Sequence, residues 1–177
     1  MIRLFVAIDI PDEIALQLVS LQSGLQDCRW SPRDNLHLTL RFLGSLDEPM
    51  AEEVDFALAH LKCKPFKVRI NELGCFGDAQ RARTVWAGAE KSQALTNLHS
   101  KVENKVQQLG LEPDKRKYAP HVTLGRLSQG TPKDAAHWIT EKGQFHPLEF
   151  EVTRMVLFST HTTSNGSIYQ PERYYVF

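Results

Sequence analysis

The sequence predicts an α+β fold in which most neighbouring strands run antiparallel. Short runs rich in β-branched and aromatic residues, such as RLFVAIDI at residues 3–10, alternate with segments whose apolar residues recur every three or four positions. The chain also ends in two strand-like runs, residues 147–160 and 167–177. The Ser-Asn-Gly sequence at 164–166 between them is typical of a hairpin turn.

The first half of the chain is expected to hold four strands and two helices. A Pro-Asp pair at 11–12 begins the first helix, and Asp-Glu-Pro at 47–49 begins the second. A glycine-rich turn at 74–82 separates the last two strands. In order, the elements are a strand at 3–10, a helix at 11–25, a strand at 36–43, a helix at 47–62, and strands at 66–73 and 84–89.

The second half begins with a third helix, which starts near Ser92 and stops before Gly110. A charged loop, EPDKRKYAP, leads to a strand at 121–127, and a short helix follows at 132–141. No Ser/Gly/Pro-rich spacer separates the halves. We therefore expect residues 1–177 to form a single domain of two intertwined lobes, and a monomer.

Composition excludes several classes of protein. The 177 residues include 21 Lys and Arg against 21 Asp and Glu, so any binding of anions must be local. Cys28, Cys63 and Cys75 lack C-x-x-C and C-x-x-H spacing, which argues against a disulfide framework or a structural zinc site. The N-terminal apolar run is too short for a signal peptide, and no stretch approaches the length of a membrane span. We expect a cytoplasmic protein without membrane contact.

One short motif occurs twice, as HLTL at 37–40 and HVTL at 121–124. Because side chains alternate along a strand, His37 and Thr39 share one face while the leucines beside them share the other. His121 and Thr123 repeat this arrangement. We expect two similar lobes that each present an imidazole and a hydroxyl to a cleft between them, where a small anion could bind.

This set of groups suits cleavage of a phosphodiester. The reaction needs a base to take a proton from the attacking oxygen and an acid to protonate the departing one, and histidine can fill either role near neutral pH. The threonine hydroxyls can hydrogen-bond the nonbridging oxygens without a metal.

Other interpretations of the motif are weaker. A single histidine on an apolar strand is more often structural, but here the same pattern occurs in both halves, whereas the other five histidines lack a partner motif. A metal-dependent phosphoesterase would need clustered Asp, His and Glu ligands, for which His-x-Thr is poorly suited. A non-catalytic RNA-binding module would not need to keep both histidines.

The two motifs, together with LFVAIDIP at 4–11, RFLG at 41–44 and APHVTLGR at 119–126, resemble the 2H phosphoesterase superfamily, in particular its RNA 2',3'-cyclic phosphodiesterase (2'-5' RNA ligase-like) family. The resemblance covers essentially the whole chain. It implies a bilobal fold with two pseudo-symmetric lobes, mostly antiparallel sheets lining a central groove, and helices outside. It also implies catalysis without metal or cofactor.

The activity implied by this resemblance is hydrolysis of an RNA 2',3'-cyclic phosphate end to a 2'-phosphomonoester. His37 is similar to the acid that protonates the leaving O3', His121 to the base that activates water, and Thr39 and Thr123 to the phosphate-binding hydroxyls. Ligation is the reverse reaction at the same site, and hydrolysis of small cyclic nucleotides is a further alternative.

Positions five residues after each histidine are Phe42 and Arg126. The resemblance implies that the aromatic ring lies near the terminal base and the arginine on phosphate. Strict alternation would instead place Arg41 on the histidine face, so a bulge or the strand end must re-aim the fifth position if the resemblance holds. From the resemblance we expect Arg126 to be the cation of the cleft, with Arg41 as the second choice.

The segment DKRKY at 114–118 adds a basic run before the second motif. It could bind RNA phosphates, with Tyr118 stacking on a base, or it could be a solvated loop. Trp30, Trp86 and Trp138 lie in or beside apolar segments and are interpreted as packing residues.

Overall fold

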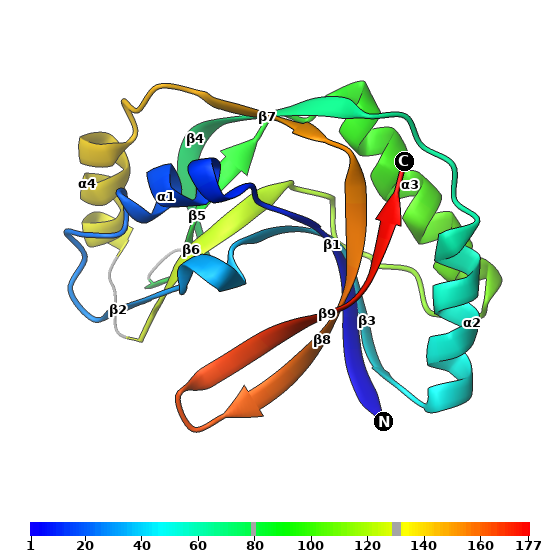
Figure 1. Cartoon of the computed structure of the whole chain (residues 1–177). Helices are drawn as coiled ribbons and strands as arrows, with labels where there is room; N and C mark the ends of the chain where they lie inside the picture. The colour runs from blue at the N-terminus through cyan, green and yellow to red at the C-terminus, as the bar shows by residue number, and fades with distance from the viewer. Residues whose placement is uncertain (79–80, 129–131) are drawn as a thin grey trace.

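The computed structural model describes residues 1–78, 81–128 and 132–177. In this part of the chain nine strands form one curled sheet in the order β7-β4-β5-β6-β3-β1-β8-β9, with β2 paired to β6 (Figure 1). Every strand pairing is antiparallel. The strands are β1 (Ile2–Asp9), β2 (Cys28–Trp30), β3 (His37–Leu46), β4 (Phe66–Asp78), β5 (Arg81–Ala89), β6 (His121–Leu127), β7 (Leu148–Val152), β8 (Arg154–Thr163) and β9 (Gly166–Val176).

The helices lie outside this sheet. Figure 1 shows α1 and α4 over the half that contains β4 to β7, and α2 and α3 beside the half that contains β1, β3, β8 and β9. The helices are α1 (Asp12–Val19), a 3₁₀ turn η1 (Arg33–Asn35), α2 (Glu48–Ala59), α3 (Gln93–Gln108) and α4 (Pro132–Lys142). The α+β prediction with antiparallel pairing is confirmed.

Local sequence explains where the helices begin. The Asp47 side chain caps α2 by accepting from the backbone amide of Met50, and Ser92 caps α3 by accepting from that of Leu95. The buried residues of α3 recur every three or four positions, which turns one stripe of the helix toward the sheet. These residues are Leu95, Leu98, Val102 and Val106.

The two lobes share one continuous sheet, which the sequence did not indicate. The strands that carry the repeated motif, β3 and β6, are neighbours at its centre, and a single residue pair, Leu38 and Val122, joins them. On one side of this seam follow β1, β8 and β9, and on the other follow β5, β4 and β7. The fold is therefore arranged around the point where the two motifs meet.

Three predicted elements differ from the structure. The first helix ends at Val19, and β2 and η1 occupy the segment after it. The predicted turn at 74–82 is mostly strand, because β4 and β5 extend to Asp78 and Arg81, while residues 79–80 lie outside the described part. Residues 148–152 form a separate strand that pairs with β4. The hairpin of β8 and β9 was predicted correctly.

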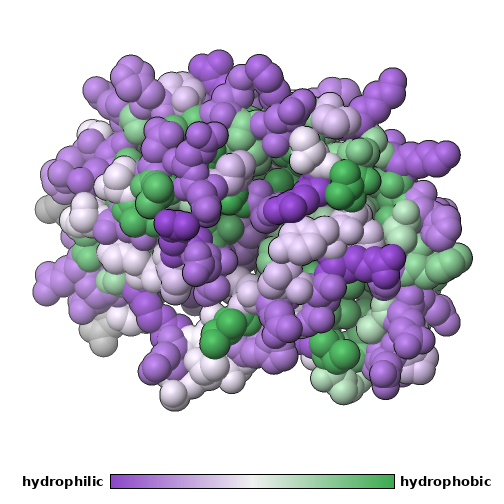
Figure 2. Space-filling model, in the orientation of Figure 1, coloured by the Kyte–Doolittle hydropathy of each residue, from purple (hydrophilic) through white to green (hydrophobic). Residues whose placement is uncertain are grey.

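The surface in Figure 2 is mostly hydrophilic, with hydrophobic residues scattered among polar ones. Among the described residues, no helix is long and apolar enough to cross a membrane. Cys28, Cys63 and Cys75 are free thiols. The cytoplasmic location, the monomeric state and the single-domain organisation stay predictions.

Candidate active site

The two motif strands expose and bury their residues in the same order. In both 37–43 and 121–127, the histidine and the threonine are half-buried, the residue between them is buried, two further buried residues follow, and the fifth position after the histidine is exposed. Leu38 and Val122 are both fully buried. Because paired residues of an antiparallel sheet point to the same side, both histidines and both threonines project from the opposite face.

The pairing of Leu38 with Val122 fixes how these side chains lie. One residue further in each direction, the antiparallel register places His37 level with Thr123 and Thr39 level with His121. The histidines therefore lie at opposite corners of a four-residue rectangle, with Cα atoms roughly 8 Å apart by standard strand spacing. A phosphate above this rectangle can meet an imidazole from either side.

Each histidine is held by the backbone two residues before it. Nδ1 of His37 lies 2.7 Å from the carbonyl oxygen of Asn35, and Nδ1 of His121 lies 2.6 Å from that of Ala119. Since a carbonyl oxygen can only accept, Nδ1 carries the hydrogen in both rings. Nε2 is then the basic atom of the neutral imidazole, and both histidines have the same tautomer.

The surroundings of both imidazoles disfavour their charged forms. Burial lowers the pKa of His37 to about 4; the hydrogen bond to Asn35 opposes this effect, and the charges of His121 and Arg126 add to it. Burial also lowers the pKa of His121, against the hydrogen bond to Ala119, and the charge of Arg126 adds to this shift as well. The charge of Arg126 thus acts on both histidines.

A bulge decides where the fifth position points. In β3, Val6 pairs with Arg41 and Ala7 with Thr39, so Leu40 is an extra residue in the ladder. The bulge reverses the alternation, and Phe42 returns to the histidine face, where its ring and that of His37 both contact Phe5.

The second motif has the same bulge at the same place. In β6, Gly125 pairs with Val85 and Thr123 with Trp86, which leaves Leu124 as the extra residue. Arg126 is exposed and makes no ion pair within the described part of the chain.

Arg41 does not lie on the histidine face, so the expectation from strict alternation is wrong. The residue is only 8% exposed, and its Nε lies 2.5 Å from a carboxylate oxygen of Glu103 on α3. It also donates to the carbonyl oxygens of Phe42 and Glu112. Glu103 in turn accepts from the backbone amide of Asp114. Arg41 therefore fastens the loop before β6 to α3 and β3.

This loop carries the basic run predicted to bind RNA. Arg116 is held by Asp114 through two hydrogen bonds at 3.0 and 2.9 Å, and its charge contributes to the lowered pKa of His121. Tyr118 is half-buried, with its ring stacked on His99 at 3.8 Å and its hydroxyl 3.5 Å from the carbonyl oxygen of Thr39. One face of the Tyr118 ring is therefore already covered.

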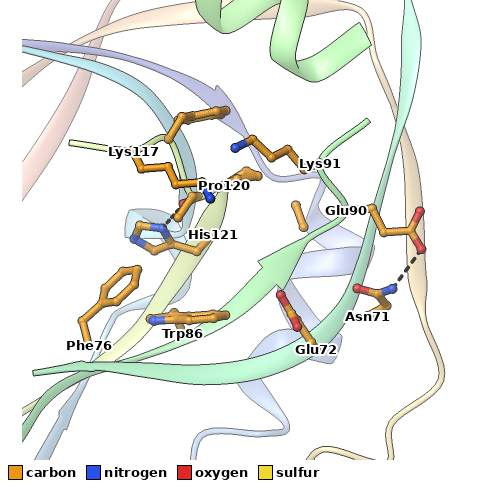
Figure 3. Close-up of a pocket in the computed structure, with 12 residues that line it drawn as sticks. Asn71, Glu72, Phe76, Trp86, Glu90, Lys91, Lys117, Pro120 and His121 are labelled. Atoms are coloured by element: carbon orange, nitrogen blue, oxygen red, sulfur yellow. Dashed lines mark hydrogen bonds between the residues drawn. The ribbon is translucent and has the colours of Figure 1, made fainter. Parts of the chain in front are cut away.

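A cavity of about 590 Å³ borders His121. Figure 3 shows His121, Phe76 and Trp86 together at one end of it. The ring of Phe76 meets that of His121 edge-on, with centroids 4.8 Å apart, and Trp86 lies 5.9 Å from it.

Trp138 is fully buried against Trp30, which confirms its interpretation as a packing residue. Trp86 packs against Phe76 and also lines this cavity. Alternation along β5 could have indicated that Trp86 shares a face with Thr84 and Gly88.

Comparison with known proteins decides the family. The family model described as the 2'-5' RNA ligase superfamily matches residues 10–164. The chain belongs to this superfamily. It is 30% identical to the RNA 2',3'-cyclic phosphodiesterase of Methanocaldococcus jannaschii over 171 residues, which are 95% of this chain and 96% of the relative. It is 34% identical to the enzyme of the same name from Aquifex aeolicus over 145 residues, or 80% and 77% of the two chains.

Solved structures share the fold. The crystal structure of E. coli LigT complexed with 3'-AMP has a TM-score of 0.81 at 23% identity and covers 99% of this chain and 98% of that one. The crystal structure of TT0787 from Thermus thermophilus has a TM-score of 0.79 at 25% identity, with 98% and 97% covered. The predicted 2H phosphoesterase resemblance and its bilobal α+β fold are confirmed, and with them, at the level of the family, the prediction of a phosphodiester hydrolase.

Proposed function

We propose that this superfamily member hydrolyses the 2',3'-cyclic phosphate end of an RNA to a 2'-phosphomonoester without a metal ion, using His37 and His121 as acid and base. The observation that carries the proposal is the matched presentation of two imidazoles. Both have Nδ1 fixed on a backbone carbonyl, both have a threonine two residues later, and they lie diagonally across a seam one residue pair wide. The names of the relatives support the substrate.

In the proposed mechanism, Nε2 of His121 takes a proton from the attacking water. As the bond from phosphorus to O3' breaks, Nε2 of His37 gives O3' a proton. Thr39, Thr123 and Arg126 donate hydrogen bonds to the phosphate oxygens, and the Arg126 charge opposes the negative charge that develops there. In this mechanism Phe42 and the uncovered face of Tyr118 contact bases of the RNA.

Because the pKa values of both histidines are lowered, the histidine that acts as acid must gain its proton when the substrate binds. Without an anion, burial keeps both imidazoles neutral at pH 7, whereas the acid must hold a proton. A bound phosphate supplies an opposite charge that favours the imidazolium. Inorganic phosphate should therefore raise the pKa of His37 in an NMR titration. An unchanged pKa in the occupied site would contradict its role as acid.

The deciding experiment incubates the purified protein with an RNA that ends in a 2',3'-cyclic phosphate, in excess EDTA, and identifies the product end. We expect full turnover and a 2'-phosphate. Complete loss of activity in EDTA that a divalent cation restores would overturn the two-histidine mechanism, and a 3'-phosphate product would reverse the identity of the leaving oxygen.

A further inference from the structure

The cavity beside His121 is enclosed by three parts of the chain. Its floor is formed by β4 and β5, one wall by the loop that precedes β6, and its rim carries Lys91 and Lys117 (Figure 3). Its volume of about 590 Å³ is within the range of pockets that bind small molecules. The mechanism proposed above uses only His121 and Tyr118 from this cavity.

Two glycines let the Trp86 ring lie flat on this floor. A Cβ atom at Gly74 would overlap the ring, and one at Gly88 would meet it at 2.8 Å, so the indole rests on the backbone of both residues. One face of the ring is therefore covered by the sheet, while the other lines the cavity (Figure 3). An open indole face is a stacking surface for a planar base.

A carboxylate lies at the edge of this ring. A Cβ atom at Gly88 would also meet Oε1 of Glu72 at 2.7 Å, which places the carboxylate beside the indole. Within the part of the chain that the structure describes, this carboxylate has no hydrogen bond or ion pair. Glu90, another acid that lines the cavity, is already engaged by Asn71 at 2.8 Å and by Arg69 at 3.4 Å.

The other half of the sheet shows why Glu72 is left unpaired. β1 and β8 correspond to β5 and β4, with Ala7 paired to Val156 where Trp86 is paired to Gly74. Two residues further along, Arg154 is neutralised by Asp9 at 2.5 Å. The corresponding pair in the second half is Glu72 and Gly88, and glycine offers the carboxylate no partner.

We propose that this cavity is a nucleobase site selective for guanine, with Trp86 as the stacking surface and Glu72 as the group that reads the base. A carboxylate only accepts hydrogen bonds, and it can accept two side by side. Guanine offers two adjacent donors, N1–H and the N2 amino group, on one edge. Adenine, cytosine and uracil each offer a single donor group on the corresponding edge, next to an acceptor that a carboxylate repels.

The cavity borders His121, and this indicates that the nucleoside it binds carries the attacking oxygen. This step rests on the proposed function. If His121 takes the proton of the attacking oxygen, whatever is attached to that oxygen lies on the side of the cavity. For a guanosine, the 5'-hydroxyl would lose its proton to His121 and bond to phosphorus. The bond from phosphorus to O3' would break, and O3' would take a proton from His37. The product is a 2'-5' linkage, and no other reactant is needed.

Nucleoside binding tests the cavity without any turnover. Guanosine, adenosine, cytidine and uridine are titrated in turn into the full-length protein while the indole Nε1–H resonance of Trp86 is followed by NMR. We expect guanosine to bind at least tenfold more tightly than the other three. Equal affinities, or guanosine binding that leaves the Trp86 resonance unmoved, would overturn the proposal.

Two matched variants locate the selectivity. Glu72→Gln should reduce the preference for guanosine to less than threefold, because an amide presents one acceptor and one donor. Glu90→Gln removes a carboxylate of the same cavity that is already engaged, and it should keep the preference. Equal loss of preference in both variants, or none in Glu72→Gln, would refute the role of Glu72.

A turnover arm separates this proposal from the proposed function. RNA with a cyclic phosphate end is supplied with each 5'-hydroxyl nucleoside, and linked and hydrolysed products are counted. We expect linkage to guanosine above the others. Hydrolysis together with equal linkage to all four would overturn the placement of the acceptor while leaving the proposed function intact. Selective guanosine binding without hydrolysis would refute the proposed function and keep the base site.

Discussion

β3 and β6 carry the same motif with the same backbone path, but the residues that follow the motif have different roles in the two strands. Both strands bulge at the position after the threonine, at Leu40 and Leu124. The next residue is Arg41 in β3, buried and paired to Glu103, and Gly125 in β6. A Cβ atom at Gly125 would meet Cys28 at 2.5 Å and Trp30 at 2.8 Å.

The difference shows that the repeat preserves the backbone and varies the chemistry. The bulge turns the fifth residue after the histidine away from the buried face in both strands, as an aromatic ring at Phe42 and as a cation at Arg126. The residue directly after the motif, Arg41 or Gly125, instead fits the packing of its own half. In the first half it fastens a loop, and in the second it makes room for β2.

The strands next to the motifs differ in the same way. Beside β3, the rings of Phe5, Phe158 and Tyr169 pack around His37. Beside β6, the flat Trp86 ring leaves the cavity that His121 borders. The two histidines therefore have similar hydrogen bonds but unequal access to ligands.

Removal of either histidine should have the largest effect and should separate their roles. His37→Ala or His121→Ala removes a proposed proton-transfer group and is expected to slow turnover about 10²- to 10⁴-fold, with the fold retained. An RNA with sulfur in place of the leaving O3' needs no acid, so it should rescue His37→Ala and not His121→Ala. Rescue of His121→Ala alone would reverse the assignment. Far-UV circular dichroism checks the fold.

Loss of the buried ion pair between Arg41 and Glu103 should have the largest effect on stability. Arg41→Ala leaves the carboxylate of Glu103 without its partner and is expected to lower the free energy of unfolding by about 3–5 kcal/mol, measured by urea denaturation. The matched control is Arg33→Ala, which breaks an exposed pair with Asp12 and should cost less than about 1 kcal/mol. Similar costs for the two variants would show that the Arg41 contacts are dispensable.

Substitution of Arg126 and of Phe42, the fifth residues after the two histidines, should affect binding of different parts of the RNA end. Arg126→Ala removes the charged group proposed to donate to the phosphate and should lower kcat/KM about 10- to 100-fold, equivalent to about 1.5–3 kcal/mol. Inhibition by inorganic phosphate should weaken with it. Phe42→Ala should leave phosphate inhibition unchanged while weakening binding of the RNA end. If Phe42→Ala weakened phosphate as much as Arg126→Ala, the division of roles would be wrong.

Acid should destabilise the protein mainly through His37. Its pKa is about 4 when folded and about 6.5 when unfolded, so below pH 6.5 the unfolded chain binds a proton that the folded site refuses. The free energy of unfolding should therefore fall by about 2 kcal/mol between pH 7 and pH 5 from this residue alone. His37→Gln should remove that part of the slope in urea denaturation. An unchanged slope would show that His37 is protonated freely.

The sequence alone determined the repeated motif and the strands that carry it. Alternation of apolar and polar residues is a local property, so the face shared by His37 and Thr39 followed from a single segment, and the class of chemistry was predicted from the two motifs together. The hairpin of β8 and β9 and the starts of α2 and α3 also followed from local signals, because turns and caps are made by neighbouring residues.

Only the tertiary structure decided how the two motifs meet and what surrounds them. The pairing of Leu38 with Val122 joins residues far apart in the chain, and the bulge at Leu40 exists only against β1. The same holds for the burial of Arg41 and for the open face of Trp86. Each depends on contacts between distant segments, in which a glycine or a carboxylate elsewhere in the chain fixes the position of the side chain.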